Sequence, residues 1–443
     1  MTKPVVAIVP YQTPRESVRR AVACCNGLGH MPRGARVFIK PNIVFWSTVT
    51  DFPKWGVITT SRVVEDVVEL LKDHGIQDIS IGEGMVTGHG DRKTPADAFE
   101  RLGYTALGKR YGVKTVDVMA RPFEKVDLGD GIKLKFNRDI LESDFIVNLP
   151  VLKTHVQTVV SLGIKNLKGT IDLSSRKRCH SPHPVKDLHY MVSHMADRMP
   201  PMLTLIDGIY SNERGPGMDG HIRRTNVLVA SADVLAADVV GAHILGHAPQ
   251  DVPHLVHAAA RRGRSLDVAD IVLAGEPIES FRVRHEYDHA YARTSEGAWL
   301  PTPFARIGME GLSFRKYDTT MCTYCSRVNG MTLAAIRGAW QGEAWDKVEI
   351  LTGKRMEPTP GMHKTILLGQ CIYRKHRDNP AIEEMIPVKG CPPDPEDILK
   401  ALRQAGISAD EAIFTKADLR PGKLMRRYRD DPAFDDALFQ VVR

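Results

Sequence analysis

The stretch "SRVVEDVVELLKDHGIQDISIGEG", residues 61–84, decides the fold because it carries a helix and a strand in immediate succession. Its first half places valine and leucine at helical spacing, with a serine at the expected N-cap and a glycine that stops the helix after His74. "DISIGEG" then predicts a buried strand that ends at Gly82 and Gly84. The β-branched run "RVFIKPN" precedes the helix, and this order predicts a parallel sheet covered by helices.

The same rhythm continues along the chain. Further strands are predicted in "VVAIVPY", "DFIVNLPVLKTH", "LTLIDGIY" and "TNVLVASAD", and the last leads into the helical stretch "VLAADVVGAHILG". We therefore expect an α/β domain over residues 1–275, with a mostly parallel sheet and helices on both faces. A connector over 276–320, a smaller cysteine-rich α+β domain over 321–403 and a helical tail over 404–443 complete the expected organisation.

Composition narrows the class of protein. The 443 residues are 43% hydrophobic and 26% charged, which is typical of a globular chain with a sizeable core. No apolar window approaches the length of a membrane span, and the first residues do not resemble an export signal, so we expect a cytoplasmic protein. The net charge of +7 is spread over the chain without a nucleic-acid motif, which argues against nucleic acid as a partner.

Polar and charged side chains follow several predicted strands, where ligands bind in open α/β sheets. These residues are Lys40, Asn42, Glu83, Lys153, His155, Asp207 and Asp233. A single aspartate at a strand end is more often a turn or cap residue than a catalyst, but the joint pattern favours a site. In "LKTHVQTVVSLGIKNLKGTI" the pairs Lys153/His155 and Lys165/Asn166 could face one cleft, and these residue types suit a carboxylate or phosphate.

Two loops add candidates. In "RKRCHSPHPVKDLHYMVSH", His180 and His183 are placed on a loop because the intervening prolines preclude a regular helix. These histidines could bind a divalent metal, act as general acid or base, contact substrate or remain solvated. In "DGIYSNERGPGMDG", residues 207–220, Gly215 and Gly217 could bring backbone amides to an anion or simply form turns.

The motifs "IKPNIV", "NLPVLKTH", "LGIKNLKGTI", "LIDGIYSNERGPG" and "ASADVLAADVVGAHILG" together resemble the family called domain of unknown function 362, over residues 5 to 275. The resemblance names no reaction, but it implies that many members carry iron–sulfur cysteines, often in a ferredoxin-like module. The family's recurring positions fall here at Lys40, Asn42, Lys153, His155, Lys165, Asn166, Gly169, His180, Asp207, Gly215 and Asp238. The chain departs from the commonest arrangement because it has no compact C-x2-C-x2-C-x3-C-P run.

Four of the seven cysteines, Cys322, Cys325, Cys371 and Cys391, are confined to the last third of the chain. Four thiolates are what a cubane iron–sulfur cluster or a tetrahedral zinc ion requires. The segment "GCPPDP" around Cys391 is similar to the cluster-ligand segments of the iron–sulfur subunit of respiratory Complex I and of hydrogenase small subunits. We therefore expect one 4Fe-4S cluster, with zinc as the alternative and unrelated core thiols as a third.

These patterns predict a redox enzyme for a small anionic substrate, with electrons relayed through the cluster from a ferredoxin-type donor. Lys153, His155, His180 and Asp207 are the predicted catalytic residues, and Lys40, Asn42, Lys165, Asn166, Gly215 and Gly217 are predicted to bind substrate. A non-redox metal-dependent lyase or isomerase with a structural cluster is one alternative. An electron-carrier or binding protein with a structural zinc or cluster is another. The charged tail could lie on the surface or at a subunit contact, which leaves a homodimer open.

Overall fold

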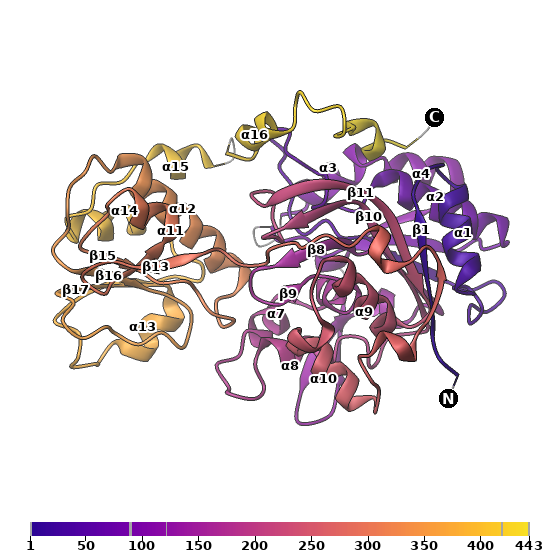
Figure 1. The fold of residues 1–443 in the computed structure, drawn as a ribbon, viewed down its shortest axis with the longest axis horizontal. Coiled ribbons are helices and arrows are strands. Elements are labelled where there is room, and N and C mark those ends of the chain that lie inside the picture. Colours follow the sequence, from indigo (N-terminus) through magenta and orange to yellow (C-terminus); the bar gives the residue numbers. More distant parts are fainter. Residues whose placement is uncertain (1, 88–90, 121, 418–419, 442–443) are drawn as a thin grey trace. The chain divides into compact units, whose positions relative to one another are not determined.

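The computed structural model describes residues 2–87, 91–120, 122–417 and 420–441, and it divides into two compact units (Figure 1). Unit 1 comprises Met1–Cys179, His189–Asp288 and Pro421–Arg443. Unit 2 comprises His180–Leu188 and His289–Arg420. Each unit is built on its own sheet.

Ten strands of the described residues form the sheet of unit 1. Its main path is β12 (Val272–Gly275), β1 (Val5–Pro10), β11 (His221–Ser231), β10 (Met202–Glu213), β7 (Phe145–Asn148), β2 (Val37–Lys40), β3 (Ile79–Glu83) and β4 (Lys114–Asp117). Strand β8 (Val151–His155) pairs with β10 and with β9 (Val159–Val160). All pairings along the main path are parallel except those of β11 with β1 and β10, and this confirms the predicted mostly parallel α/β sheet.

Helices cover both faces of this sheet. One face packs against α1 (Glu16–Cys24), α2 (Ser61–Asp73), α3 (Lys93–Arg101) and α4 (Tyr104–Tyr111) in one apolar core. On the other face, Gly241 of α9 (Val234–Ile244) lies against Ile206 of β10, whose neighbour Leu205 points into the first core. Successive side chains of a strand point to opposite faces of the sheet, and here both sets are apolar. Helices must therefore cover both faces. Shorter helices of unit 1 are α5 (Arg138–Leu141), α6 (Gly163–Asn166), α7 (Leu173–Cys179), α8 (Leu188–Ser193) and α10 (Pro253–Arg261).

Helix α2 begins one residue away from the predicted position. Ser61, expected as the N-cap, is the first helical residue, and Thr60 is the N-cap. The backbone N–H of Thr60 donates to Oδ2 of Asp207 on β10 at 2.6 Å. The acceptor at this helix start therefore comes from a residue distant in the sequence rather than from the local serine.

Unit 2 contains a smaller sheet in the order β15 (Leu312–Phe314), β16 (Val348–Leu351), β17 (Lys364–Leu368) and β18 (Glu384–Val388). All of its pairings are parallel, so this part is a second α/β sheet rather than the α+β arrangement that the sequence suggested. Helices α12 (Thr323–Ala339) and α14 (Pro395–Gln404) pack on one face, and α13 (Gln370–His376) packs on the other. Parallel strands need crossover helices, and α12 and α13 occupy those positions.

The remaining elements are short. Two hairpins are formed by β5 (Phe123–Asp127) with β6 (Lys133–Asn137), and by β13 (Tyr291–Arg293) with β14 (Trp299–Pro301). Short helices α11 (Thr302–Arg306), α15 (Ala412–Thr415) and α16 (Arg420–Leu424) lie in the last third of the chain. Within the part of the chain that the structure describes, no helix has both the length and the hydropathy needed to cross a bilayer.

Candidate functional site

The carboxyl end of β2 carries a buried ion pair. Nζ of Lys40 lies 2.8 Å from Oε1 of Glu83, which ends the adjacent strand β3, and both side chains are at most 2% exposed. Glu83 also accepts hydrogen bonds from the backbone N–H groups of Ile43 and Gly84. Burial lowers the pKa of Lys40, and the charge of Glu83 opposes that shift. The Lys40–Glu83 pair therefore lies at the edge of the sheet where the sequence predicts a site.

Lys153 of β8 is the second buried lysine at this edge. Its ammonium donates to Oδ1 of Asn42, to the carbonyl of Val57 at 2.8 Å and to the carbonyl of Pro216 at 3.4 Å. Burial lowers the pKa of Lys153 to about 7. A lysine with such a pKa can gain or lose a proton near neutral pH, which suits it for proton transfer as well as for anion binding.

Lys165 of α6 faces His155, two residues after Lys153 on β8. Nζ of Lys165 lies 3.4 Å from Nε2 of His155, while Nδ1 of that ring accepts the backbone N–H of Gln157 at 3.1 Å. A neutral ring that accepts at Nδ1 carries its proton on Nε2, which then points at the Lys165 amine. Burial, followed by the charges of Lys168 and Lys153, lowers the pKa of Lys165 well below its usual range. The pair thus holds an exchangeable proton between two bases.

Buried asparagines link these lysines. Nδ2 of Asn42 donates to Oδ1 of Asn166 at 3.2 Å, and Nδ2 of Asn166 donates to the carbonyl of Lys40 and to Oδ1 of Asn148. Asn148 in turn donates to the carbonyl of Gly163 at the start of α6. The structure therefore brings together Lys40, Asn42, Lys153, His155, Lys165 and Asn166 of the predicted set.

The other predicted residues of unit 1 contact backbone. Asp207 is 2% exposed, and its two carboxylate oxygens accept the N–H groups of Thr60 and Ile209. Burial raises the pKa of Asp207. The loop with Gly215 and Gly217 lies against β8, because Gly215 accepts from the N–H of Val156 and Gly217 accepts from Asn212. This loop also supplies the Pro216 carbonyl to Lys153. Their predicted roles in catalysis and substrate binding stay predictions.

The two loop histidines belong to unit 2. The imidazole of His180 is buried, with Nδ1 2.8 Å from the carbonyl oxygen of Thr319, and its own carbonyl accepts from the Lys354 ammonium. His183 is exposed, and its Nδ1 accepts the N–H groups of Val185 and Lys186. A metal-binding role for this pair stays a prediction.

The four predicted metal-ligating cysteines all follow strands of the small parallel sheet. Cys322 follows β15 and is the N-cap of α12, and Cys325 lies within the first turn of that helix. Cys371 lies in the first turn of α13 after β17, and Cys391 follows β18. Because the carboxyl ends of parallel strands meet at one edge, the topology gathers all four thiols at the same edge of this sheet.

Local contacts tie the cysteine segments together. The N–H of Gln370 donates to the carbonyl of Gly390 at 2.9 Å, so the residues preceding Cys371 and Cys391 are hydrogen-bonded. A Cβ atom at Gly369 would lie 3.6 Å from Sγ of Cys325 and 3.9 Å from Pro393. Gly369, with φ +111°, is therefore the position where the segments of three cysteines converge.

The electrostatics of the thiols agree with this proximity. A hydrogen bond from the Cys325 thiol, together with backbone N–H groups at the start of α12, lowers the pKa of Cys322. That same bond, burial and the charges of the other three cysteines raise the pKa of Cys325. Burial raises the pKa of Cys371, and the positive charge of Lys354, which follows β16, opposes that shift. The same charge contributes to the lowered pKa of Cys322. Lys354 thus acts on two of the four thiols, and four thiolates are the donor set that an iron–sulfur cluster needs.

In the described residues, no group of three or more histidine, cysteine, aspartate or glutamate side chains is arranged to hold a metal ion. Cys322 and Cys325 are in direct contact through a hydrogen bond between their thiols. Cys371 and Cys391 lie on neighbouring segments of the same edge and are exposed.

Part of this chain is similar in sequence to known proteins. Residues 37–243 match the family model described as Domain of unknown function (DUF362). The match supports the resemblance seen in the sequence, and it ends before the four cysteines, so the iron–sulfur subtype stays a prediction. A thylakoid-associated protein of Synechocystis is 27% identical over 259 residues, which cover 58% of this chain and 77% of that protein.

Among solved structures, the lactate racemase apoprotein of Thermoanaerobacterium thermosaccharolyticum matches with a TM-score of 0.35 at 15% identity. The match covers 55% of this chain and 57% of the other.

Sequence reasoning missed three residues near the lysines as members of the site. Glu83 was noted only as a strand-end residue, yet it is the partner of Lys40. Asn148 ends β7 as a polar residue in an apolar run, a signal that could have been used. His254 of α10 is fully buried, and neither ring nitrogen has a hydrogen-bond partner in the described residues. Burial, followed by the charges of His189 and Lys165, lowers the pKa of His254 well below its usual range. The sequence of α10 alone does not predict this environment.

Proposed function

We propose that this protein binds one 4Fe-4S cluster through Cys322, Cys325, Cys371 and Cys391 and acts as a redox enzyme on a small anionic substrate. The observation that carries the proposal is the position of all four cysteines after strands of one parallel sheet. Such a cluster, when bound, supplies one-electron transfer. Zinc bound by the same thiols is the alternative occupant.

The residues of unit 2 would hold the cluster in defined ways. The first turn of α12 directs backbone N–H groups at the sulfur of Cys322, which favours its thiolate. Lys354 adds positive charge to the same edge, which offsets the negative charge of a tetrathiolate set. Gly369 leaves open the space beside Cys325 that a side chain would fill.

The residues of unit 1 would bind and protonate the substrate. Lys153 and Lys165 supply cationic groups for a carboxylate or phosphate in their protonated forms. His155 and Lys165, 3.4 Å apart, share a proton that either could deliver. Lys40 is paired with Glu83, so in this proposal it stabilises the sheet edge by packing and charge and does not contact the substrate. A ferredoxin-type donor, a homodimer and a cytoplasmic location stay predictions of this proposal.

Metal analysis tests the cluster. We expect protein purified without oxygen to be brown and to contain about four iron and four sulfide per chain, the content of one such cluster. Cys371→Ser and Cys391→Ser should lose most of the iron, since each removes one ligand. Cys24→Ser is the matched control because Cys24 is an exposed cysteine of α1, outside the set, and should keep the iron. A colourless wild type with one zinc per chain would contradict the cluster.

Anion binding separately tests the lysine site, which is formed by Lys153, Lys165 and His155. Titration calorimetry with inorganic phosphate should give binding that Lys165→Met weakens by tenfold or more, as expected for loss of a charged hydrogen bond. Lys109→Met is the control, since Lys109 is an exposed lysine of α4. Equal affinities in both variants would remove the lysine site from the proposal while leaving the cluster intact.

A non-redox lyase or isomerase is favoured by one observation. The lowered pKa values of Lys153 and Lys165 beside His155 are those of proton-transfer groups, which such reactions need without electron transfer. In that case the cysteine site would be structural. Once a substrate is found, turnover that is the same with the cluster oxidised or reduced would select this candidate.

A further inference from the structure

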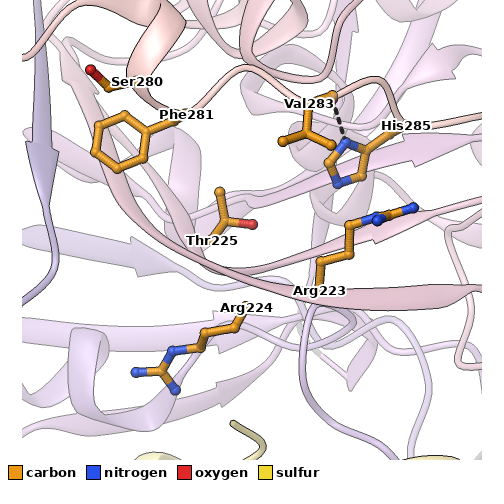
Figure 2. A pocket seen from close by; sticks show the side chains of 7 residues that line it. All are labelled: Arg223, Arg224, Thr225, Ser280, Phe281, Val283 and His285. Carbon is orange, nitrogen blue, oxygen red and sulfur yellow. Dashed lines mark hydrogen bonds between the residues drawn. The ribbon is translucent and has the colours of Figure 1, made fainter.

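Unit 1 contains a cavity that includes none of the predicted site residues (Figure 2). It has a volume of about 380 Å³, within the range of small-molecule sites. Its walls come from β11, from the end of the short turn Ile278–Ser280 and from the residues that follow that turn. They are formed by Arg223, Arg224, Thr225, Ser280, Phe281, Val283 and His285. The cavity therefore has cationic, hydroxyl and apolar groups within one small space.

The alternation of side chains along β11 places Arg223 and Arg224 on opposite faces of the sheet. Arg223 and Thr225 are two residues apart on β11 and share one face of the sheet. Arg224 belongs to the opposite face, where Nη1 donates to the hydroxyl of Tyr210 and the guanidinium lies 4.6 Å from the centre of that ring. Figure 2 shows Arg224 directed away from His285. Arg223 is thus the cation on the face that carries Thr225 and His285.

The charge on this face is positive in excess. One carboxylate, Glu213, is shared by two arginines, at 2.9 Å from Arg214 and 3.2 Å from Arg223. Nε of Arg223 is buried and has no hydrogen-bond partner in the described residues, and the side chain is 41% exposed. A guanidinium that is partly exposed beside a cavity and shares its carboxylate partner with a second arginine favours a further carboxylate.

A chain of hydrogen bonds fixes what Thr225 can offer. Nδ1 of His285 lies 2.7 Å from the carbonyl of Val283, which can only accept, so the neutral ring carries its proton on Nδ1. Nε2 must then accept from Ser211 at 2.8 Å, and Ser211 must accept from Thr225 at 2.6 Å. Burial lowers the pKa of His285, which is consistent with a neutral ring. The proton of the Thr225 hydroxyl is therefore used in its hydrogen bond to Ser211. Towards a ligand, this hydroxyl can only accept a hydrogen bond.

The remaining walls are apolar. Phe281 lines the cavity beside Val283, which is 45% exposed although it is a large hydrophobic side chain. Covering these side chains with a ligand would remove apolar surface from water. A ligand for this cavity thus needs an anionic end, a hydroxyl group and an apolar body.

We propose that this cavity is a second binding site, separate from the lysine site, for a small hydroxycarboxylate with an apolar body. Its carboxylate pairs with Arg223, its hydroxyl donates to Thr225, and its apolar part covers Phe281 and Val283. Ser211 and His285 are positioning residues that hold the Thr225 hydroxyl in its accepting orientation.

Titration calorimetry with mandelate and with phenylacetate, which lacks the hydroxyl, tests this site on the full chain. The wild type should bind mandelate several-fold more tightly than phenylacetate. Arg223→Gln should weaken both by about tenfold or more, the loss expected for a charged hydrogen bond. Thr225→Val should remove the preference for mandelate and leave phenylacetate unchanged. Arg282→Gln is the matched control, because Arg282 is an exposed arginine of the same loop that does not line the cavity.

Several outcomes would overturn the proposal. These are no binding of either acid to the wild type at millimolar concentration, unchanged binding in Arg223→Gln, or equal weakening in Arg282→Gln. Loss of binding in Lys165→Met but not in Arg223→Gln would move the acids to the lysine site. If thermal unfolding shows that Arg223→Gln is not folded, Arg223→Lys decides, since it keeps the charge but not the guanidinium fork. Weaker binding supports the site, and unchanged binding overturns it.

Discussion

The two sheet edges of this protein use the same topology for opposite kinds of chemistry. At the edge of unit 1, Lys40 and Lys153 are at most 1% exposed and their ammonium groups bond to protein oxygens. At the edge of unit 2, Cys371 and Cys391 are exposed. Parallel strands gather residues at their carboxyl ends in both cases. The difference is that the two lysines are buried and paired within the protein, whereas two of the four cysteines are exposed.

Glu83→Gln should break the lysine edge and give the largest loss of stability. The change leaves Lys40 buried without its counter-charge, and loss of one partner of a buried pair costs about 3–5 kcal/mol. Denaturant unfolding measures the loss. Asp78→Asn is the control, because the Asp78–Lys114 pair is exposed and should contribute less than about 1 kcal/mol. Similar losses in both variants would mean that the buried pair has no special role.

Gly369→Ala should disturb the cysteine edge by a smaller amount. The φ of +111° at Gly369 is strained for any other residue, so a loss of about 1–3 kcal/mol is expected. The new Cβ also enters the space beside Cys325, so iron content should fall. Gly361→Ala, at φ +81° with nothing within 4 Å of its Cβ, tests strain alone and should keep the iron. Iron that is retained in Gly369→Ala would argue against ligation beside this glycine.

The pH dependence of stability should sharpen the description of Lys153. Its pKa of about 7 lies below the value of 10.5 expected in the unfolded chain, so between these values the unfolded state binds the extra proton. Stability should therefore rise as pH increases above 7, by at most about 1.4 kcal/mol per pH unit from this one group. Lys153→Met should reduce that slope in urea unfolding measured from pH 7 to 9. An unchanged slope would assign the titration to other groups.

His183→Ala should have the smallest effect. The side chain is exposed and its Nδ1 accepts local backbone N–H groups, so a change within about 0.5 kcal/mol is expected. Thermal unfolding and iron analysis together measure it. A clear loss of bound metal would instead support the divalent site at His180 and His183 that the sequence left open.

The outline of the fold was readable from local pattern. Strands β1, β2, β3, β10 and β11 and helices α2 and α9 all lie in segments whose apolar periodicity predicted them. Helix α2 begins one residue earlier than predicted, with Thr60 as its N-cap, and the N–H of Thr60 donates to Asp207 from a distant strand. The parallel order of the small sheet was also missed, since nothing in the spacing of its strands states which of them pair.

The sequence by itself determined that chemically capable residues stand at strand ends and that four cysteines cluster in the last third of the chain. Only the tertiary structure decided their partners, such as Lys40 with Glu83 and Lys165 with His155. It also placed Asp207 against Thr60 and gave His254 a fully buried position. The physical reason is that periodicity reports which side of an element is buried, whereas hydrogen bonds and burial of charge depend on contacts between segments far apart in the chain.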